Sequence, residues 1–415
     1  MPHSKIISGL DIGTSKITAI VSQYFEVENK LNVVAVASVP ATGFRKGQIV
    51  NLEEASKTLN QCIESAERMA GFEISNLHIS LAANYIESVN SQGVVAISNP
   101  NGEIGKDDIV RVIEAAKAIS LPTGKEIIHV IPRRYTVDGQ DGIIDPVGMN
   151  GIRLELEAHI ILASTPALKN LHKCLEEIGI TPISIIYSGL TTTKAAATET
   201  EKELGVAIVD IGGSITTITI YQEGSPTYSA VIPVGANNVT NDLAIGLRLS
   251  IDEAEKIKLR LGRIIENKKY QDEIELSQFG ITTDENHKIS LQTAVSGIIK
   301  PRLEEVFSLV WKQIEASGFS ESIPAGVVLT GGGSLTTQTR DICGKIIPLP
   351  LRLASPPKIG GIVDEISNPA FTSTIGLILY VKDNQQPQTT KNKKSRVNIG
   401  GIFGRLKNII EPLLP

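Results

Sequence analysis

The amino-acid sequence predicts an α/β protein with two lobes, an α+β subdomain inserted in the first lobe, and an amphipathic helix at the C-terminus. Three observations lead to this prediction. Two similar strand–turn–strand segments lie far apart in the chain. Strand and helix patterns alternate around both of them. Near the end, a polar linker is followed by apolar residues at helical spacing.

Composition sets the broad class. A chain of 415 residues suggests roughly two to three domains, and 41% hydrophobic residues are ordinary for a globular protein. The net charge of -5 argues against broad nucleic-acid binding. Three widely spaced cysteines indicate neither a disulfide framework nor a zinc site, which favours a reducing cytoplasm. Since there is no signal-peptide pattern and no apolar run of roughly 18 residues, we expect a soluble or peripheral membrane protein.

A strand–turn–strand pattern around Asp210 is the central motif, with the sequence DIGGSITT. Asp210 ends the first strand, Gly212 and Gly213 let the backbone turn and approach a ligand, and Ser214 adds a hydroxyl. A turn of this kind presents backbone N–H groups to a phosphate, while the aspartate faces a metal-bound phosphate.

The same motif occurs near the N-terminus as DIGTSKIT, which begins at Asp11 and turns at Gly13. One such hairpin is more often an ordinary β-turn, because Asp-x-Gly is common turn chemistry. Two matching copies instead favour an internal duplication, in which two phosphate-binding hairpins face each other across a cleft.

A third glycine-rich turn follows a buried strand at 326–330. The turn consists of Gly331, Gly332, Gly333 and Ser334. We expect a helix from Leu335, and a glycine turn at a helix N-terminus is a ready anion and nucleotide site. A plain strand-to-helix turn is the alternative, but three consecutive glycines exceed what such a turn needs.

The other elements follow from periodicity. Strand patterns cover residues 6–20 (with a turn inside), 31–39, 77–81, 86–97, 125–135, 153–162, 183–188, 206–209 and 216–220. Helix patterns cover residues 50–70, 106–120, 166–179, 190–200, 237–247, 251–261, 291–317 and 371–381.

Local signals set several boundaries. Asn51 is a plausible N-cap for the first helix, and Gly71 follows its end. Ser250 and Glu253 stand at capping-box spacing before another helix.

Two prolines mark irregular places. Pro132 indicates an edge strand or a bulge, and Pro301 indicates a kink in the long helix. Residues 139–151 form a loop, and residues 264–292 are polar with short strands. The region 84–162 therefore reads as a small α+β insertion in the first lobe.

Several common site motifs are absent. The sequence has no GxxxxGK[ST], no GxGxxG after a strand, no HExxH and no GxSxG. His129 and His159 lie on strand patterns, and we expect both to be structural. Any nucleotide must therefore be held by the two aspartate hairpins.

The motifs beginning at Asp11, Asp210 and Leu329, in that order, resemble the actin, sugar-kinase and DnaK-type chaperone superfamily. In that superfamily they are the phosphate-1, phosphate-2 and adenosine loops. Narrower features resemble the FtsA family of bacterial cell division proteins: HVIP at 129–132, GIIDPVG at 142–148 and AEKIK at 254–258. The resemblance covers residues 5–381.

The resemblance implies an actin-like two-lobed ATPase fold with four subdomains. Subdomain 1A holds residues 1–83 and 163–200, the insertion 84–162 is subdomain 1C, subdomain 2A holds 201–250 and 325–381, and subdomain 2B holds 251–324.

It also implies a site for ATP and Mg²⁺ in the central cleft. The residues carried over to the phosphates are Thr14, Ser15 and Lys16 on one side and Gly212, Gly213 and Ser214 on the other. Asp11 and Asp210 would hold Mg²⁺ through water. Glu255 and Lys258 would approach the ribose and base, and 331–334 would pass under the adenosine. One departure is Ser214, where the family often has a third glycine, so the geometry of this loop is in question. No general base stands out, so no catalytic residue is assigned and at most weak ATPase activity is expected.

The C-terminal region reads as a linker and an anchor. Residues 382–398 are polar and carry a basic cluster, which is typical of a flexible linker. In 399–415 the apolar residues recur at helical spacing: Ile399, Ile402, Phe403, Leu406, Ile409, Ile410 and Leu413. This pattern favours an amphipathic helix lying in a membrane surface. A helix docked on its own domain or on a partner is the alternative.

The resemblance implies a scaffold that polymerises on the cytoplasmic face of the inner membrane at the division septum. It would bind anionic lipid, form filaments with its own copies through subdomain 1C and neighbouring subdomains, recruit other division proteins, and tether the C-terminal tail of FtsZ. Lys300, Arg302 and Glu304 are the candidates for the FtsZ contact, although a solvated helix face would look the same. The alternatives are a PilM-like protein of pilus assembly and a small-molecule kinase or phosphatase of the same superfamily.

Overall fold

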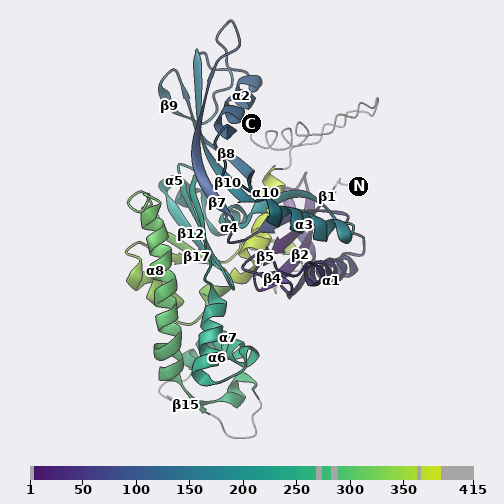
Figure 1. The fold of residues 1–415 in the computed structure, drawn as a ribbon, viewed down its shortest axis with the longest axis vertical. Helices are drawn as coiled ribbons and strands as arrows, with labels where there is room; N and C mark the ends of the chain where they lie inside the picture. The colour runs from purple at the N-terminus through teal and green to yellow at the C-terminus, as the bar shows by residue number, and fades with distance from the viewer. Residues whose placement is uncertain (1–3, 268–272, 282–287, 362–365, 385–415) are drawn as a thin grey trace.

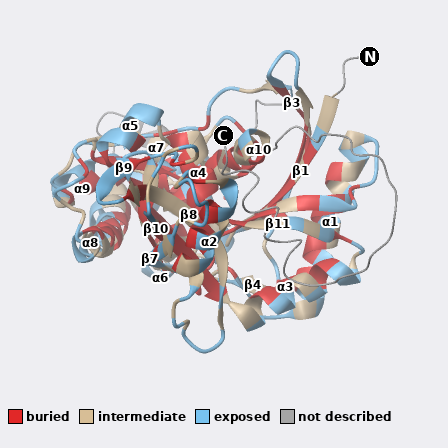
Figure 2. Ribbon diagram, turned by 90° about the horizontal axis from the view of Figure 1, so that it is seen from above, coloured by how far each residue is buried: buried red, intermediate tan, exposed pale blue. Residues whose placement is uncertain are grey.

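The computed structural model describes residues 4–267, 273–281, 288–361 and 366–384. In these residues two larger sheets and one smaller sheet carry the fold, each with its own buried core. Figure 2 shows that buried residues follow the strands and the helix faces turned toward them.

The first sheet runs in the order β11-β6-β1-β2-β3-β19. Its strands are β11 (Thr181–Tyr187), β6 (Asn76–Leu81), β1 (Ser4–Ile12), β2 (Lys16–Phe25), β3 (Lys30–Pro40) and β19 (Gly360–Gly361). The helices against it are α1 (Leu52–Ala70) with α3 (Thr165–Glu177), and α4 (Ser188–Ala196) with α10 (Thr372–Asn384). A two-residue hairpin, β4 (Phe44–Arg45) and β5 (Gln48–Ile49), precedes α1.

The caps of α1 confirm the sequence prediction. The side chain of Asn51 accepts a hydrogen bond from the backbone N–H of Glu54, and Gly71 ends the helix with φ 81°. The helix buries one stripe, including Leu59 and Cys62, against β2 and β3.

The inserted subdomain, residues 84–162, carries a separate antiparallel sheet in the order β7-β10-β8-β9. Its elements are β7 (Glu87–Ala96), α2 (Lys106–Lys117), β8 (Lys125–Val137), β9 (Gln140–Ile143) and β10 (Arg153–Ser164). Pro132 lies at a bulge, as predicted, because Ala158 pairs with Pro132 while the adjacent Glu157 pairs with Arg134. Arg133 is thereby left out of the register.

The second lobe holds a sheet in the order β14-β13-β12-β17-β18. Its strands are β12 (Val206–Ile211), β13 (Thr216–Gln222), β14 (Ser225–Ile232), β17 (Val327–Thr330) and β18 (Leu351–Leu353). Its helices are α5 (Glu199–Leu204), α6 (Ala236–Leu247), α7 (Ile251–Asn267), α8 (Lys300–Ala316) and α9 (Thr339–Ile346). A small pair, β15 (Glu273–Glu275) and β16 (Lys288–Ser290), lies beyond α7. Figure 1 shows β15 and the inserted subdomain at opposite ends of the longest axis of the molecule.

The two larger sheets repeat one plan, which confirms the predicted duplication. In each, an antiparallel hairpin (β1–β2 or β12–β13) has a parallel strand beside its first member, β6 or β17. Asp11 stands beside Ser80 in the parallel register, and Asp210 stands beside Thr330. The aspartates therefore occupy equivalent positions at the carboxyl ends of equivalent strands.

Some predicted elements differ from the structure. The helix expected from Leu335 begins only at Thr339, after a 3₁₀ turn at Gly332–Leu335. The loop expected at 139–151 contains β9, because this segment pairs with the end of β8. The helix expected at 190–200 is divided into α4 and α5, because Thr198 and Glu201 form a capping box that starts a new helix. Strand β14 was not predicted.

The long helix at 291–317 is continuous but not uniform. Residues Gln292–Ile299 form a π-helical segment, and α8 follows directly with Pro301 in its first turn. Pro301 therefore follows a segment with wider helical spacing, in which the backbone N–H of Lys300 donates to the carbonyl of Val295. A proline has no N–H to donate and interrupts the i→i−4 pattern, so it stands where that pattern is already altered.

The end of the described chain returns to the first lobe. β19 pairs with β3, and Ile375, Leu377 and Ile378 of α10 belong to the first core. The family resemblance implies that residues 325–381 all belong to subdomain 2A in the second lobe, and for α10 this is wrong. Its apolar face packs on the first sheet, which depends on the path of the whole chain and not on local pattern.

Candidate functional site

The turns of the two aspartate hairpins meet across the boundary between the lobes. The backbone N–H of Ser214 donates a hydrogen bond to Oγ1 of Thr14 at 2.8 Å. Oγ of Ser15 donates to Oδ1 of Asn237 at 3.3 Å. The structure thus brings together the phosphate-1 and phosphate-2 residues that were predicted to face each other.

Asn237 was not predicted as a site residue, yet it contacts both hairpins. Its Nδ2 donates to Oγ of Ser214 at 3.2 Å, and its backbone N–H donates to the carbonyl of Gly213 at 2.7 Å. It lies in the first turn of α6, which begins directly under the second hairpin. A sequence signal was available, since the helix predicted at 237–247 starts with this amide.

Asp11 is held by the first turn of α10. Oδ1 of Asp11 accepts a hydrogen bond from Oγ of Ser373 at 3.1 Å, and Oδ2 accepts one from Oγ1 of Thr374 at 2.7 Å. Burial raises the pKa of Asp11, and these hydrogen bonds oppose the rise. Ser373 and Thr374 were not predicted, because nothing in the sequence links them to a residue so far away.

Asp210 occupies the equivalent place in the second lobe. Its Oδ2 accepts a hydrogen bond from Oγ1 of Thr192 at 2.8 Å. Burial raises the pKa of Asp210 to about 6, and the negative charge of Asp11 adds to the rise. The negative charges of Asp11 and Asp210 therefore repel each other.

Lys16 lies beside Asp11. Burial lowers the pKa of Lys16 to about 8, and the charge of Asp11 opposes the change. Its Nζ lies 3.0 Å from the centroid of the Phe371 ring.

These residues fit a magnesium–nucleotide complex. Two partly enclosed carboxylates that repel each other would be stabilised by a cation near both, and the hydroxyls of Thr14 and Ser15 and the backbone N–H of Ser214 lie in the adjoining turns. Within the described residues, no three His, Cys, Asp or Glu side chains could together hold a metal ion. An ion bound here would take most of its ligands from water and phosphate, which suits Mg²⁺.

The glycine-rich turn lies against the second hairpin. A Cβ added to Gly331, which has φ 85°, would be 2.1 Å from Oδ1 of Asp210, and one on Gly333 would be 2.3 Å from the Ile211 side chain. Close packing thus accounts for these two glycines without a ligand. Ser334 is buried and donates to the carbonyl of Gly331 at 2.7 Å.

Glu255 and Lys258 belong to a network between α6 and α7. Nζ of Lys258 lies 2.7 Å from Oε2 of Glu255 and donates to Oγ1 of Thr240 at 2.8 Å. Lys258 is buried, whereas the Glu255 side chain is 38% exposed. Glu255 is therefore the more accessible of the two predicted base and ribose contacts.

The three candidates for a partner contact differ in their surroundings. Arg302 makes a two-point ion pair with Asp242 of α6, with Nε–Oδ2 at 2.5 Å and Nη2–Oδ1 at 3.0 Å. Lys300 and Glu304 form an exposed pair at 3.7 Å on one face of α8. Arg302 therefore joins two helices, and Lys300 and Glu304 present the free surface.

The predicted tail residues at 399–415 lie outside the described residues. Among the helices that are described, none is both long and apolar enough to cross a membrane.

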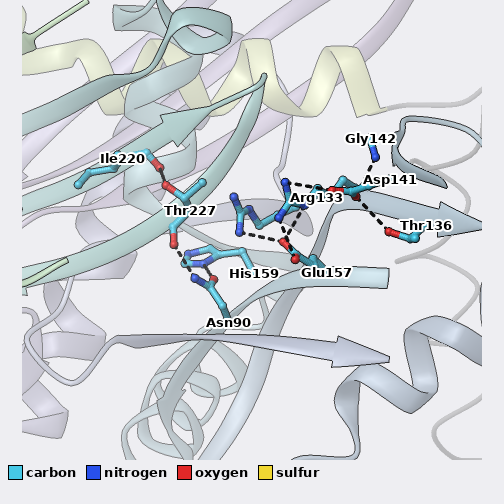
Figure 3. Close-up of polar contacts among 10 residues, drawn as sticks. Asn90, Arg133, Thr136, Asp141, Gly142, Glu157, His159, Ile220 and Thr227 are labelled. Atoms are coloured by element: carbon cyan, nitrogen blue, oxygen red, sulfur yellow. Dashed lines mark hydrogen bonds and ion pairs between the residues drawn. The ribbon is translucent and has the colours of Figure 1, made fainter. Parts of the chain in front are cut away.

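His129 and His159 are structural, as predicted. Nε2 of His129 accepts a hydrogen bond from the backbone N–H of Tyr187 at 3.0 Å. His159 lies between Oδ1 of Asn90 at 2.7 Å and Oγ of Ser229 at 3.0 Å. Figure 3 shows His159 beside Asn90, whose Nδ2 donates to the carbonyl of Thr227 on β14 at 2.9 Å and so joins the inserted subdomain to the second lobe. Burial lowers the pKa of His129 to about 4 and that of His159 to about 3.

A cavity of about 700 Å³ lies elsewhere, between β8, β11 and the end of α10. It is lined by residues such as His78, Ile183 and Asn384, and by none of the predicted site residues. The nucleotide hypothesis therefore rests on the chemistry of the hairpins and not on this hollow.

Comparison with known proteins gives two family-model matches. Residues 83–162 match the SHS2 domain inserted in FtsA, and residues 207–376 match the model for cell division protein FtsA. The cell division protein FtsA of Neisseria meningitidis serogroup B is 36% identical over 414 residues, which cover 99% of each chain.

Two solved structures show the same fold. A PilM–PilN type IV pilus biogenesis complex aligns with a TM-score of 0.63 at 17% identity, over 90% of this chain and 98% of that chain. MreB5 of Spiroplasma citri bound to ADP aligns with a TM-score of 0.51 at 16% identity, over 92% and 98%. The chain thus has the two-lobed actin-like fold with an inserted SHS2 domain.

Proposed function

The chain belongs to the FtsA family of cell division proteins, and from this premise we propose that it binds ATP with Mg²⁺ between its lobes, assembles on the cytoplasmic membrane and tethers FtsZ there. The observation that carries the nucleotide part is the meeting of the two hairpins, each of which ends a strand with an aspartate.

In this proposal each lobe contributes one half of the phosphate site. Thr14, Ser15 and Lys16 would donate hydrogen bonds from the first lobe, and the backbone N–H groups of Gly213 and Ser214 would donate from the second. The N–H of Gly212 donates to the carbonyl of Ile215 at 2.9 Å and thereby closes the turn that holds the other two. The Ser214 N–H, which here donates to Thr14, would exchange that partner for a phosphate oxygen. Asp11 and Asp210 would hold Mg²⁺ through water molecules that donate hydrogen bonds to their carboxylates, and the ion would neutralise charge on the phosphates.

The adenosine side is proposed on the same basis. The side chain of Glu255 is 38% exposed and would contact the ribose, with Lys258 paired to it. Residues 331–334 would pass under the adenosine. MreB5 of Spiroplasma citri, which shares this fold, was solved bound to ADP. No described residue stands out as a general base, so we propose a nucleotide-dependent scaffold with at most weak ATPase activity.

The membrane and partner contacts are also proposals. The apolar residues of 399–415 would lie in an anionic lipid surface at the division septum, behind the basic linker. Lys300 and Glu304 would contact the FtsZ tail, and Arg302 would hold α8 in place for them. Copies of the chain would associate through the inserted subdomain, and other division proteins would join the assembly.

The four-subdomain division is proposed with one change. Residues 360–384 are better grouped with subdomain 1A, because β19 and α10 join its sheet and core. The other boundaries stay as predicted.

The alternatives have less support. The PilM likeness is at 17% identity and concerns the fold alone, whereas the FtsA relative is 36% identical. A small-molecule kinase would need a catalytic acid or base beside the phosphates, and we identify no such residue.

Co-sedimentation with anionic vesicles in Mg-ATP tests the scaffold. The full chain is compared with a chain ending at Asn384, which keeps α10 and its 2.6 Å ion pair between Lys194 and Asp383. We expect only the full chain to sediment, to a lesser extent with neutral vesicles, and to bring FtsZ with it. Equal sedimentation of both chains would contradict the anchor, and FtsZ left in the supernatant would contradict the tether.

A further inference from the structure

The first turn of α10 and the residue before it, Phe371, contact Asp11 and Lys16 of the first hairpin. Ser373 and Thr374 donate to the two carboxylate oxygens of Asp11, and the ring of Phe371 lies under the amine of Lys16. These contacts join residues more than 350 positions apart. Residues 371–374 belong neither to the two hairpins nor to the glycine turn.

We propose that this turn, residues 371–374, is a further element of the nucleotide site, in which Thr374 and Ser373 position Asp11 for the metal and Phe371 positions Lys16 for the phosphates. The inference rests on the proposed binding of ATP and Mg²⁺. It assigns positioning residues and no catalytic residue.

The hydroxyl contacts fix the carboxylate. Thr374 is fully buried, and its Oγ1 donates to Oδ2 of Asp11 at 2.7 Å. With Oδ1 held by Ser373 as well, the carboxylate cannot rotate freely. A preorganised carboxylate binds a hydrated ion without a further ordering cost.

Ser373 is itself held from two other elements. Its Oγ lies 2.8 Å from Oγ of Ser80 on β6 and 3.0 Å from Oγ1 of Thr191 on α4. A hydroxyl has one proton, so Ser373, which donates to Asp11, can only accept from Ser80. The hydroxyl of Thr191 donates to the carbonyl of Ser188 at 2.9 Å, so its oxygen lies beside Ser373 without a second proton to give.

Phe371 contacts the amine of Lys16. The amine of Lys16 lies 3.0 Å from its ring centroid, where a cation is attracted by the ring face. The ring thus holds the amine in a partly buried place where its charge would otherwise be disfavoured.

The test separates metal from phosphate effects by measuring the dissociation constant of ATP for the full chain, in excess Mg²⁺ and in EDTA. For Thr374→Val we expect ATP binding in EDTA to stay within about threefold of wild type, and the gain given by Mg²⁺ to fall about tenfold, because a hydrogen bond to a charged group is lost. Thr374→Ser, which keeps the hydroxyl, should restore the gain. For Phe371→Leu we expect a similar loss of affinity, about threefold to tenfold, with and without Mg²⁺.

Thr372→Val is the matched control. Thr372 is equally buried in the same turn, but its Oγ1 lies 2.7 Å from Oγ1 of Thr330 and does not contact Asp11. We expect a lower melting temperature for this variant and an unchanged Mg²⁺ gain. Should Thr374→Val not fold, Ser373→Ala takes its place in the same measurements.

The outcomes are distinct. A wild-type chain that does not bind ATP overturns the proposed nucleotide function and this inference with it. A wild type that binds Mg-ATP, with a Thr374→Val variant whose Mg²⁺ gain is unchanged, overturns the inference alone. An equal loss of the gain in Thr372→Val also overturns it, because the effect would then be a general loss of packing.

Discussion

Thr14 Oγ1 accepts a 2.8 Å hydrogen bond from the backbone N–H of Ser214, which lies 200 residues later in the chain. This bond joins the turns of the two duplicated hairpins. Ser214 is also the residue that departs from the glycine often found in the family. It is not among the described residues with positive φ, so a side chain is accommodated there without backbone strain.

Replacing Ser214 with glycine should therefore weaken the fold. Ser214→Gly loses the hydrogen bond from Asn237 and adds freedom to the unfolded chain, so we expect the free energy of unfolding to fall by about 0.5–1 kcal/mol. Urea denaturation measures this. Ser214→Ala, which removes the hydroxyl alone, should lose less. ATP affinity should change less than about threefold, because the backbone N–H remains. Tenfold tighter binding by Ser214→Gly would instead mean that the serine hinders the loop.

Gly331→Ala should be strongly destabilising. At Gly331, φ is 85° and ψ is 164°, which is a conformation open essentially to glycine alone, and a Cβ would meet Asp210 at 2.1 Å. We expect a loss of about 2 kcal/mol or more in the free energy of unfolding. Gly344→Ala on α9 is the matched control, since a Cβ there meets nothing within 4 Å, and it should leave stability unchanged or slightly higher. Similar stabilities for the two variants would refute this account of the turn.

Arg302 should contribute to stability, unlike its neighbours on α8. Its two-point pair with Asp242 joins α6 and α8, so Arg302→Ala should cost about 1–3 kcal/mol. Lys300→Ala breaks only an exposed pair and should change stability by less than about 0.5 kcal/mol. Denaturation of both variants and of Asp242→Ala, together with the double variant, gives the coupling energy. A coupling near zero would show that the pair does not hold the helices together.

Acid should destabilise the protein through its buried histidines. His159 has a pKa lowered from 6.5 to about 3, so above pH 6.5 neither the folded nor the unfolded state is protonated and its stabilisation is fully present. Below that pH His159 is protonated in the unfolded chain but stays neutral in the folded state, so the free energy of unfolding falls. Between pH 6.5 and 5 this loss is about 2 kcal/mol for one such histidine.

His159→Gln removes this titration. Urea denaturation at pH 7 and at pH 5 should show a smaller loss of stability on acidification for the variant than for wild type. Equal pH dependence in wild type and His159→Gln would rule out this role for His159.

The two hairpins, the inserted subdomain and most helices could be predicted from the sequence. These features follow from local chemistry: runs of β-branched residues, Asp-x-Gly turns, and caps such as Asn51 and Gly71 act on neighbours in the chain. The equivalence of Asp11 and Asp210 could be predicted because the two hairpins share the sequence pattern DIG followed by hydroxyl residues.

The residues that complete the site could be found only from the packing of the whole chain. Ser373 and Thr374 reach Asp11, Asn237 reaches Ser15, and Arg302 reaches Asp242 because separate segments pack side by side. The return of α10 to the first lobe and the close packing of Gly331 on Asp210 have the same origin. Periodicity reports which face of an element is buried. It does not report against which distant element that face is buried, because this depends on the path of the whole chain.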